Sequence, residues 1–158
     1  MSAANKIIQL VKHPVRFRMF LFWKLPSAFF SGVRVRYIDE EQCKVTVPFK
    51  WLTQNPFRST YFASLSMAAE MSTGVLAMMH VHGRKISMLV VKVESEYFKK
   101  AVGRTTFICT DGLLIRQAIE EAVRTGEPSS VRAASAGLND NEETVALFHI
   151  TWSFKAKT

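Results

Sequence analysis

One carboxylate stands in the middle of the longest uncharged stretch of the chain. Glu70 is the only acidic residue between Ser59 and Gly83, where small and apolar residues predominate. A carboxylate on a buried helix costs several kcal/mol unless it is paired or neutralised, and burial raises its pKa toward the range of a general base. Glu70 is therefore a candidate catalytic base or nucleophile. The alternative is a structural acid, bonded to a nearby backbone group or lying in a dimer interface.

Further candidates for chemistry lie on either side of Glu70. Phe62 and Ala63 fall in the first turn of a predicted helix, where backbone N–H groups lack intrahelical partners and meet the positive end of the helix dipole. They could stabilise a developing oxyanion. Asn55, in the preceding loop, could hold a water or a carbonyl oxygen, or could simply satisfy its own turn before a proline. Thr73, one turn beyond Glu70, could bond its carboxylate or be an ordinary helix residue.

Substrate contacts are expected from Tyr61, Arg58 and Met67. Methionine suits an adaptable apolar pocket, although the helix methionines, Met67 among them, also suit a plain core. The chain has no Gly-rich phosphate loop, no GxSxG and no HExxH, so nucleotide hydrolysis, serine hydrolysis and zinc proteolysis are poorly supported. No metal or cofactor is predicted.

The net charge of +8 and the pI near 9.8 require an explanation. Basic residues are spread along the chain without a recognition motif, so nucleic-acid binding is not favoured. An anionic ligand such as coenzyme A, or a membrane surface, fits the same charge. Residues 5–30 are the most hydrophobic segment, but basic residues and Pro14 interrupt it. We expect a helix that is broken near Pro14 and packs on the domain, with a Phe/Trp-rich peripheral membrane anchor as the alternative.

The two cysteines give the only indication of compartment. Cys43 and Cys109 each lie in a strand-like context and lack the spacing of metal ligands. They are expected to be buried thiols in a reducing compartment, which favours a cytoplasmic protein without structural zinc.

The hydrophobic pattern predicts one α+β domain over residues 1–158. Residues 1–31 form a helical extension, and a core over 32–158 carries a helical insertion at 113–126. Alternation with period two predicts strands at 33–39, 43–49, 85–98, 104–111, 130–138 and 144–157. Between the first two strands and the others lies a helix from about Ser59 to His80, capped by Ser59 or Thr60. Because this helix is apolar all round, a curved, mostly antiparallel sheet of about six strands must wrap around it.

This arrangement resembles the hotdog fold, and one segment is similar to thioesterases of the phenylacetate-pathway and 4-hydroxybenzoyl-CoA type. In those enzymes a loop Asn precedes His-Gly-Gly at the start of the buried helix, and an acid follows two turns later. Here Asn55 precedes Tyr61-Phe62-Ala63, and Glu70 stands at the place of the acid. The segment "EYFKKAVGRT", with Gly103, resembles the next turn of that family. Similarity extends over about residues 33–110 and the closing "ITWSF", and the extra helices match an uncharacterised hotdog branch labelled as a domain of unknown function.

The resemblance implies a hotdog fold, hydrolysis of an acyl-CoA thioester and a site at the interface of a homodimer or tetramer. Glu70 would act as base or nucleophile, with the helix N–H groups as oxyanion hole and the coenzyme A thioester as substrate. Because side chains replace the two glycines of the motif, the second hypothesis is a non-catalytic acyl-binding or lipid-binding protein in which Phe62 fills the thioester slot.

Overall fold

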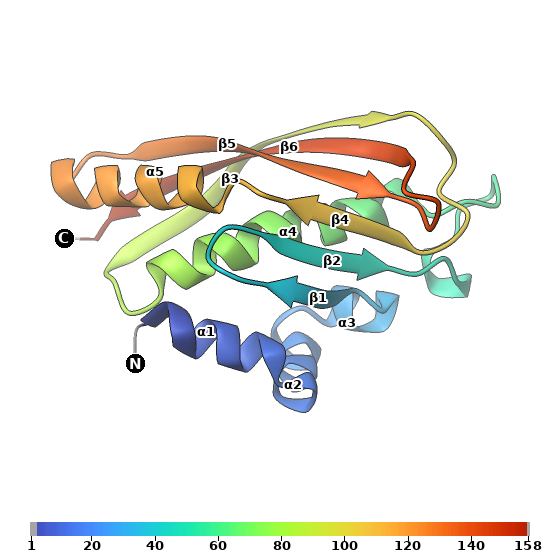
Figure 1. The fold of residues 1–158 in the computed structure, drawn as a ribbon, viewed down its shortest axis with the longest axis horizontal. Coiled ribbons are helices and arrows are strands. Elements are labelled where there is room, and N and C mark those ends of the chain that lie inside the picture. The colour runs from blue at the N-terminus through green and yellow to red at the C-terminus, as the bar shows by residue number, and fades with distance from the viewer. Residues whose placement is uncertain (1–2, 158) are drawn as a thin grey trace.

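Six strands form one curved antiparallel sheet around a long helix in this computed structural model, which describes residues 3–157 (Figure 1). The strand order is β1-β2-β4-β5-β6-β3, and every neighbouring pair is antiparallel. The predicted α+β hotdog architecture is confirmed. In chain order the elements are α1 (Ala3–Lys12), α2 (Pro14–Lys24), α3 (Pro26–Ser31), β1 (Arg34–Ile38), β2 (Cys43–Val47), η1 (Trp51–Thr53), α4 (Phe62–Val81), β3 (Ile86–Tyr97), β4 (Thr105–Cys109), α5 (Gly112–Thr125), β5 (Ser129–Leu138) and β6 (Thr144–Ala156).

Helix α4 runs along the inside of the curved sheet. Small side chains let the strands approach it closely, and Ala68, Ala69 and Ala77 are completely buried. By length and composition alone α4 could cross a membrane, but its burial inside the domain is that of a core helix. Buried Phe107, Phe148 and further core residues of the sheet complete the core around it.

The start of α4 differs from the prediction. The helix begins at Phe62, with Tyr61 as its N-cap and no side-chain capping bond. Ser59 and Thr60 do not cap it because both are engaged elsewhere. The Thr60 N–H and hydroxyl both donate to the carbonyl of Ala101, at 2.8 and 3.1 Å, which fixes the loop before α4 to the chain after β3.

Strand β3 lies at the edge of the sheet and pairs only with β6. Directly opposed residues of antiparallel strands share a face, so Val93 and Tyr97 face inward with their buried partners Ile150 and Ala146. Nevertheless Val93 and Tyr97 remain about half exposed, at 51% and 46%. The inner side of β3 is therefore uncovered near the start of α4.

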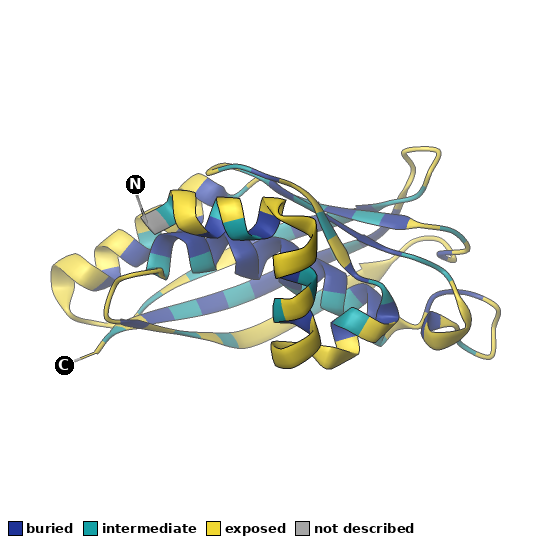
Figure 2. Cartoon of the chain, turned by 90° about the horizontal axis from the view of Figure 1, so that it is seen from below, coloured by how far each residue is buried: buried dark blue, intermediate teal, exposed yellow. Residues whose placement is uncertain are grey.

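Three short helices precede the sheet (Figure 2). The expected break occurs at Pro14, and Pro26 adds a second break that the sequence analysis did not predict. Each proline occupies the first turn of the helix that it begins, where its missing N–H costs nothing. The two cysteines are buried and unbonded, as predicted, and oppose each other in the pairing of β2 with β4.

Candidate functional site

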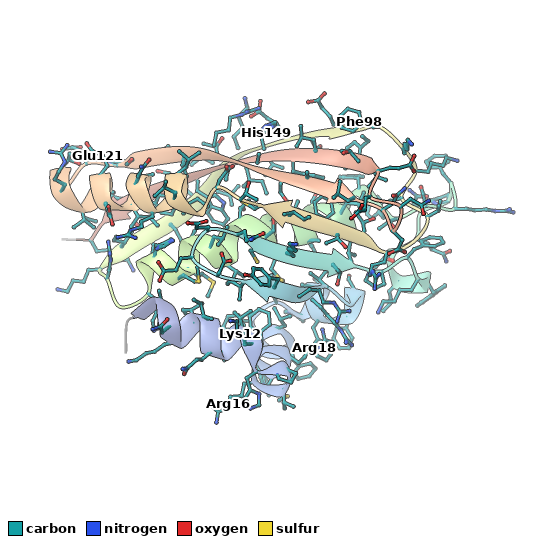
Figure 3. The ribbon with its side chains drawn as sticks, viewed as in Figure 1. Lys12, Arg16, Arg18, Phe98, Glu121 and His149 are labelled. Atoms are coloured by element: carbon teal, nitrogen blue, oxygen red, sulfur yellow. The ribbon has the colours of Figure 1, made fainter. Side chains whose placement is uncertain are left out.

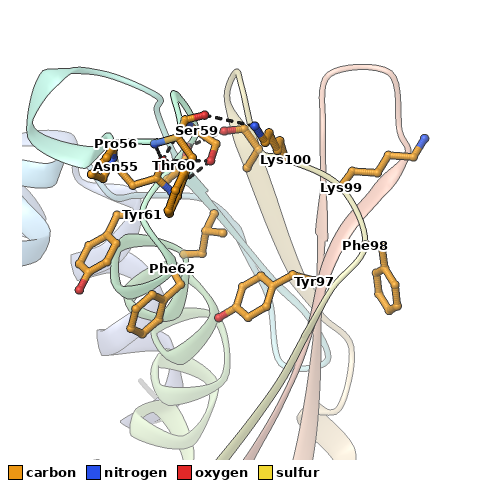
Figure 4. Close-up of a pocket in the computed structure, with 13 residues that line it drawn as sticks. Asn55, Pro56, Ser59, Thr60, Tyr61, Phe62, Tyr97, Phe98, Lys99 and Lys100 are labelled. Carbon is orange, nitrogen blue, oxygen red and sulfur yellow. Dashed lines mark hydrogen bonds between the residues drawn. The ribbon is translucent and has the colours of Figure 1, made fainter.

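A cleft of about 540 Å³ opens at the N-terminal end of α4 (Figure 4). One wall is the loop before α4 and the first turn of the helix, and the other is the end of β3 with the loop that follows it. Five aromatic residues and two lysines are among the residues that line it: Phe57, Tyr61, Phe62, Tyr97, Phe98, Lys99 and Lys100. The cleft can accept an apolar group next to a helix N-terminus.

The structure brings three of the predicted site residues into this cleft and leaves five outside its lining. Asn55, Tyr61 and Phe62 line it. The residues that do not line it are Glu70, Ala63, Thr73, Arg58 and Met67. Three of the predicted residues therefore line this cleft, and the candidate base lies further along α4.

The Asn55 side chain stabilises the turn in which it lies. Its Oδ1 accepts from the backbone N–H groups of Phe57 and Ser59, at 3.0 and 3.2 Å, and its Nδ2 lies 3.1 Å from Ser59 Oγ. Arg58 occupies the left-handed region in this turn, with φ of 58°, an uncommon conformation for a side-chain-bearing residue. The amide of Asn55 thus stabilises the loop that forms the cleft wall.

The first turn of α4 carries two free backbone donors. The Tyr61 carbonyl accepts from the N–H groups of Ser64 and Leu65, at 2.9 and 3.2 Å. The N–H groups of Phe62 and Ala63, in contrast, donate to no group among residues 3–157. The Phe62 ring is 55% exposed and packs edge-on against Tyr61, with ring centroids 4.8 Å apart. Unpaired donors at a positive helix end suit an oxyanion.

Glu70 lies on the same stripe of α4 as Phe62, since residues four and eight apart share a helix face. Its carboxylate lies beside Gly74 and the inner face of the sheet: a Cβ on Gly74 would be 3.0 Å from Glu70 Oε1 and 3.1 Å from Trp152 Cζ2. No residue in the described chain donates a hydrogen bond to this carboxylate. Burial raises the pKa of the Glu70 carboxyl above its ordinary value.

Of the two roles considered for Thr73, the structure does not show a bond to the Glu70 carboxylate. Its hydroxyl donates to the backbone carbonyl of Glu70 at 3.0 Å, and accepts from Trp152 Nε1 at 2.9 Å. Threonine in a helix commonly bonds a carbonyl in the preceding turn. Because its one proton is used in this way, Thr73 joins α4 to β6 and does not donate to the Glu70 carboxylate.

The far wall of the cleft was missed. Tyr97 ends β3 and Phe98 follows it, and the Nζ of Lys100 lies 3.4 Å from the carbonyl of Phe57. Two adjacent aromatic residues place one ring on the inner face of a strand, and this signal was available in the sequence. The sequence did not show that the end of β3 lies next to the start of α4.

Sequence and structure comparisons agree with this architecture. Residues 15–154 match the model of a family described as a domain of unknown function, DUF4442. The chain belongs to the DUF4442 family. A search of curated proteins finds no match to this DUF4442 chain.

Solved structures with this fold include named thioesterases. A protein of unknown function from Pseudomonas aeruginosa, named a probable thioesterase, superposes with a TM-score of 0.78 at 18% identity, covering 97% of this DUF4442 chain and 95% of its own. A protein of unknown function from Chlorobaculum tepidum gives 0.76 at 17% identity, covering 98% and 94%. A thioesterase from Haemophilus influenzae gives 0.64 at 10% identity, covering 89% of each chain. The DUF4442 chain has the hotdog fold of these proteins.

Proposed function

We propose that this DUF4442 protein is a thioesterase that hydrolyses acyl-CoA thioesters, with Glu70 as its general base or nucleophile. The observation that carries the proposal is the Glu70 carboxylate, which is half-buried, accepts no hydrogen bond from the described residues and has a raised pKa. The structural similarity to named thioesterases supports the reaction class.

The chemistry follows from the groups described above. An ionised Glu70 takes a proton from water, and the hydroxide attacks the thioester carbonyl carbon. Alternatively, the carboxylate attacks directly and water then cleaves the anhydride. The N–H groups of Phe62 and Ala63 stabilise the oxyanion, each by about 3 kcal/mol when well placed. In the first route, collapse of the tetrahedral intermediate expels the thiolate, which takes up the proton held by Glu70, and leaves the carboxylic acid. In the second route, collapse expels the thiolate and leaves the anhydride, which water cleaves to the carboxylic acid and free Glu70.

One helix does not present all these groups to the same carbonyl. Phe62 and Glu70 are eight residues apart, about 12 Å along the helix axis, whereas the oxyanion donors and the attacking water both lie about 3 Å from the reacting group. The proposal therefore includes a homodimer, in which the first turn of α4 from one subunit meets Glu70 of the partner subunit.

Strand β3 is the element that suits this dimer. Its outer edge is unpaired over Ile86–Tyr97, and an edge strand readily adds a strand from another chain. Exposed apolar side chains flank that edge: Leu89, Val91, Val93 and Tyr97. Pairing through the C-terminal half of β3 would continue the sheet and cover its inner face near Phe62.

The cleft indicates how the substrate lies. The rings of Tyr61, Phe62 and Tyr97 would contact the acyl group, because they supply apolar surface next to the helix N-terminus. Lys100, at the margin, would contact a phosphate of coenzyme A, since its ammonium is exposed and has no carboxylate partner among the described residues. Lys99 is less available because it pairs with Glu143.

Release of free thiol from short, long and aromatic acyl-CoAs tests the proposal. Wild type should turn over at least one of them, and Glu70→Gln should reduce the rate by about 100-fold or more. Glu127→Gln is the matched control, because it makes the same change at an exposed residue after α5. This control should retain wild-type activity.

Absence of turnover by folded wild type on every substrate would refute the enzymatic proposal. In that case, saturable binding of an acyl-CoA without thiol release would indicate the second function, an acyl-binding or lipid-binding protein. The exposed Phe62 ring at the free N–H groups is the observation that favours this alternative.

A further inference from the structure

The solvent side of α2 is apolar. Val15, Met19, Phe22 and Trp23 are spaced by four, three and one residues, so they lie on one face of the helix, with exposures of 64%, 50%, 38% and 73%. The core contact of α2 is made by its other face, through buried Phe17 and other residues. In Figure 2 the outward side of this helix is accordingly exposed. A surface helix normally presents polar residues to solvent. This face of α2 instead leaves apolar side chains uncovered.

Exposed apolar residues continue from α2 to its neighbours. The Phe22 ring contacts the rings of Trp23 and Phe30, with centroids 5.4 and 6.1 Å apart. Lys50, next to η1, donates from Nζ to the carbonyl of Phe30 at 2.8 Å, which joins η1 to α3. We call the joint surface the α2–η1 patch; its residues are Met19, Phe22, Trp23, Leu25, Phe30, Trp51 and Leu52.

Nearly all the net charge of the protein lies in the segment that carries this patch. The full chain has 21 Lys and Arg against 13 Asp and Glu, a net charge of +8. Residues 1–38 contain seven of these cations and no acidic residue; the cations are Lys6, Lys12, Arg16, Arg18, Lys24, Arg34 and Arg36. The remaining residues carry 14 cations and 13 acids, a net charge of +1.

Cations border the apolar residues directly. Arg16 and Lys24 are exposed at the two ends of α2, and Lys50 precedes Trp51 at η1. Figure 3 shows Lys12, Arg16 and Arg18 gathered on the N-terminal helices. Arg18 joins α2 to α3 and to the chain before β1, since its guanidinium donates to the carbonyls of Val33 and Phe29, both at 3.3 Å.

We propose that the α2–η1 patch docks the protein on the surface of an anionic lipid bilayer. Tryptophan and phenylalanine insert at the headgroup boundary, and flanking Lys and Arg are attracted to anionic lipids. A second copy of this chain fits less well, because a symmetric contact would oppose two segments that each carry seven uncompensated cations. The loop that lines one wall of the cleft, residues 55–60, follows η1 closely in the chain, so the patch and the cleft are joined by a short segment.

Co-sedimentation of the full chain with lipid vesicles tests the proposal. Wild type should sediment with vesicles of phosphatidylcholine and phosphatidylglycerol, much less with phosphatidylcholine alone, and added salt should weaken the binding. Trp23→Ser should weaken it by about tenfold or more, because a large apolar ring is lost from the buried contact. Leu113→Ser, an equally accessible apolar residue on α5, should have no effect.

A second pair of variants separates local charge from total charge. Lys24→Glu and Lys155→Glu change the net charge equally, but only Lys24 borders the patch. The proposal expects weaker binding for Lys24→Glu alone. Equal losses for both, equal binding to neutral and anionic vesicles, or no loss with Trp23→Ser would overturn it. So would an oligomer that dissociates on the Trp23→Ser substitution, which would show that a second copy covers the patch.

Discussion

At the scale of single residues, Glu70 combines a half-buried position with a carboxylate that accepts no hydrogen bond from residues 3–157. Thr73, one turn further along the helix, bonds instead to a backbone carbonyl and to Trp152. A carboxylate without a donor is held at a cost to stability, and proteins keep such costs mainly where function needs them.

The free energy of unfolding should be lowered by the charged Glu70 carboxylate, and this effect should depend on pH. Since burial raises the folded-state pKa of Glu70 above 4.5, the charged form destabilises the fold above that raised pKa. The penalty disappears below the unfolded pKa. Glu70→Gln should therefore raise the midpoint of urea unfolding at pH 7, and the gain should shrink as the pH falls toward 4.5.

Glu127→Gln serves as the control and should not shift the midpoint at either pH. If Glu70→Gln lowers the midpoint at pH 7, the carboxylate has a stabilising partner, and its assignment as an unpartnered base is wrong.

The residue types in the sequence were enough to predict helix α4 and to single out its one acid, Glu70. They were not enough to predict the hydrogen-bond partners of each side chain. Glu70 could be singled out because it is isolated in the sequence. The bonds of Thr73 could not be predicted, because its acceptor and donor choices depend on Trp152, 79 residues away in the chain. The same holds for Asn55, whose turn is local, but whose place in a cleft that the end of β3 completes depends on the tertiary fold.

At the scale of elements, one glycine fixes α5 against the turn between β1 and β2. The N–H of Gly112 donates to the carbonyl of Glu41 at 3.0 Å. A Cβ at this position would lie 2.3 Å from the carbonyl oxygen of Glu40. Backbone atoms cannot yield as a flexible side chain does, so α5 begins here only with glycine.

We expect Gly112→Ala to destabilise the protein by about 2 kcal/mol or more, because overpacking forces the backbone to shift. Gly103→Ala is the matched control: its Cβ would meet only Asp140 Oδ2, at 3.6 Å. Thermal unfolding compares the two variants. Similar melting temperatures for both would show that the β1–β2 turn moves freely.

Periodicity predicted most elements because it reflects which face each one buries. The six strands and α5 lie close to their predicted residues. The errors lie at the ends: the break at Pro26, and the start of α4, which is delayed because Thr60 bonds to Ala101. Tertiary hydrogen bonds decided that boundary, and helix propensity did not.

At the scale of the whole molecule, β3 leaves the sheet open along one side. The proposed dimer closes it, so the protein should elute and scatter light as a species of about twice 17.9 kDa. Val93→Lys should shift this species toward the monomer by at least about tenfold in Kd, because the pairing would bury a charge.

Leu113→Lys makes a comparable change at an exposed apolar residue of α5 and should leave the assembly intact. A wild-type monomer at micromolar concentration, or a dimer insensitive to Val93→Lys, would exclude association through β3.

The order of strands also governs how the protein can be made. Among residues 3–157, β3 pairs only with β6, which follows it by more than 45 residues, at Thr144–Ala156. A ribosome adding about 5–20 residues per second needs roughly 3–12 s to pass from residue 98 to 156. During that interval β3 has no sheet partner on either side and the apolar α4 is incompletely enclosed. The sheet therefore cannot be completed until β6 has been synthesised, and a nascent chain stopped before β6 presents a chaperone with an unpaired strand next to an uncovered apolar helix.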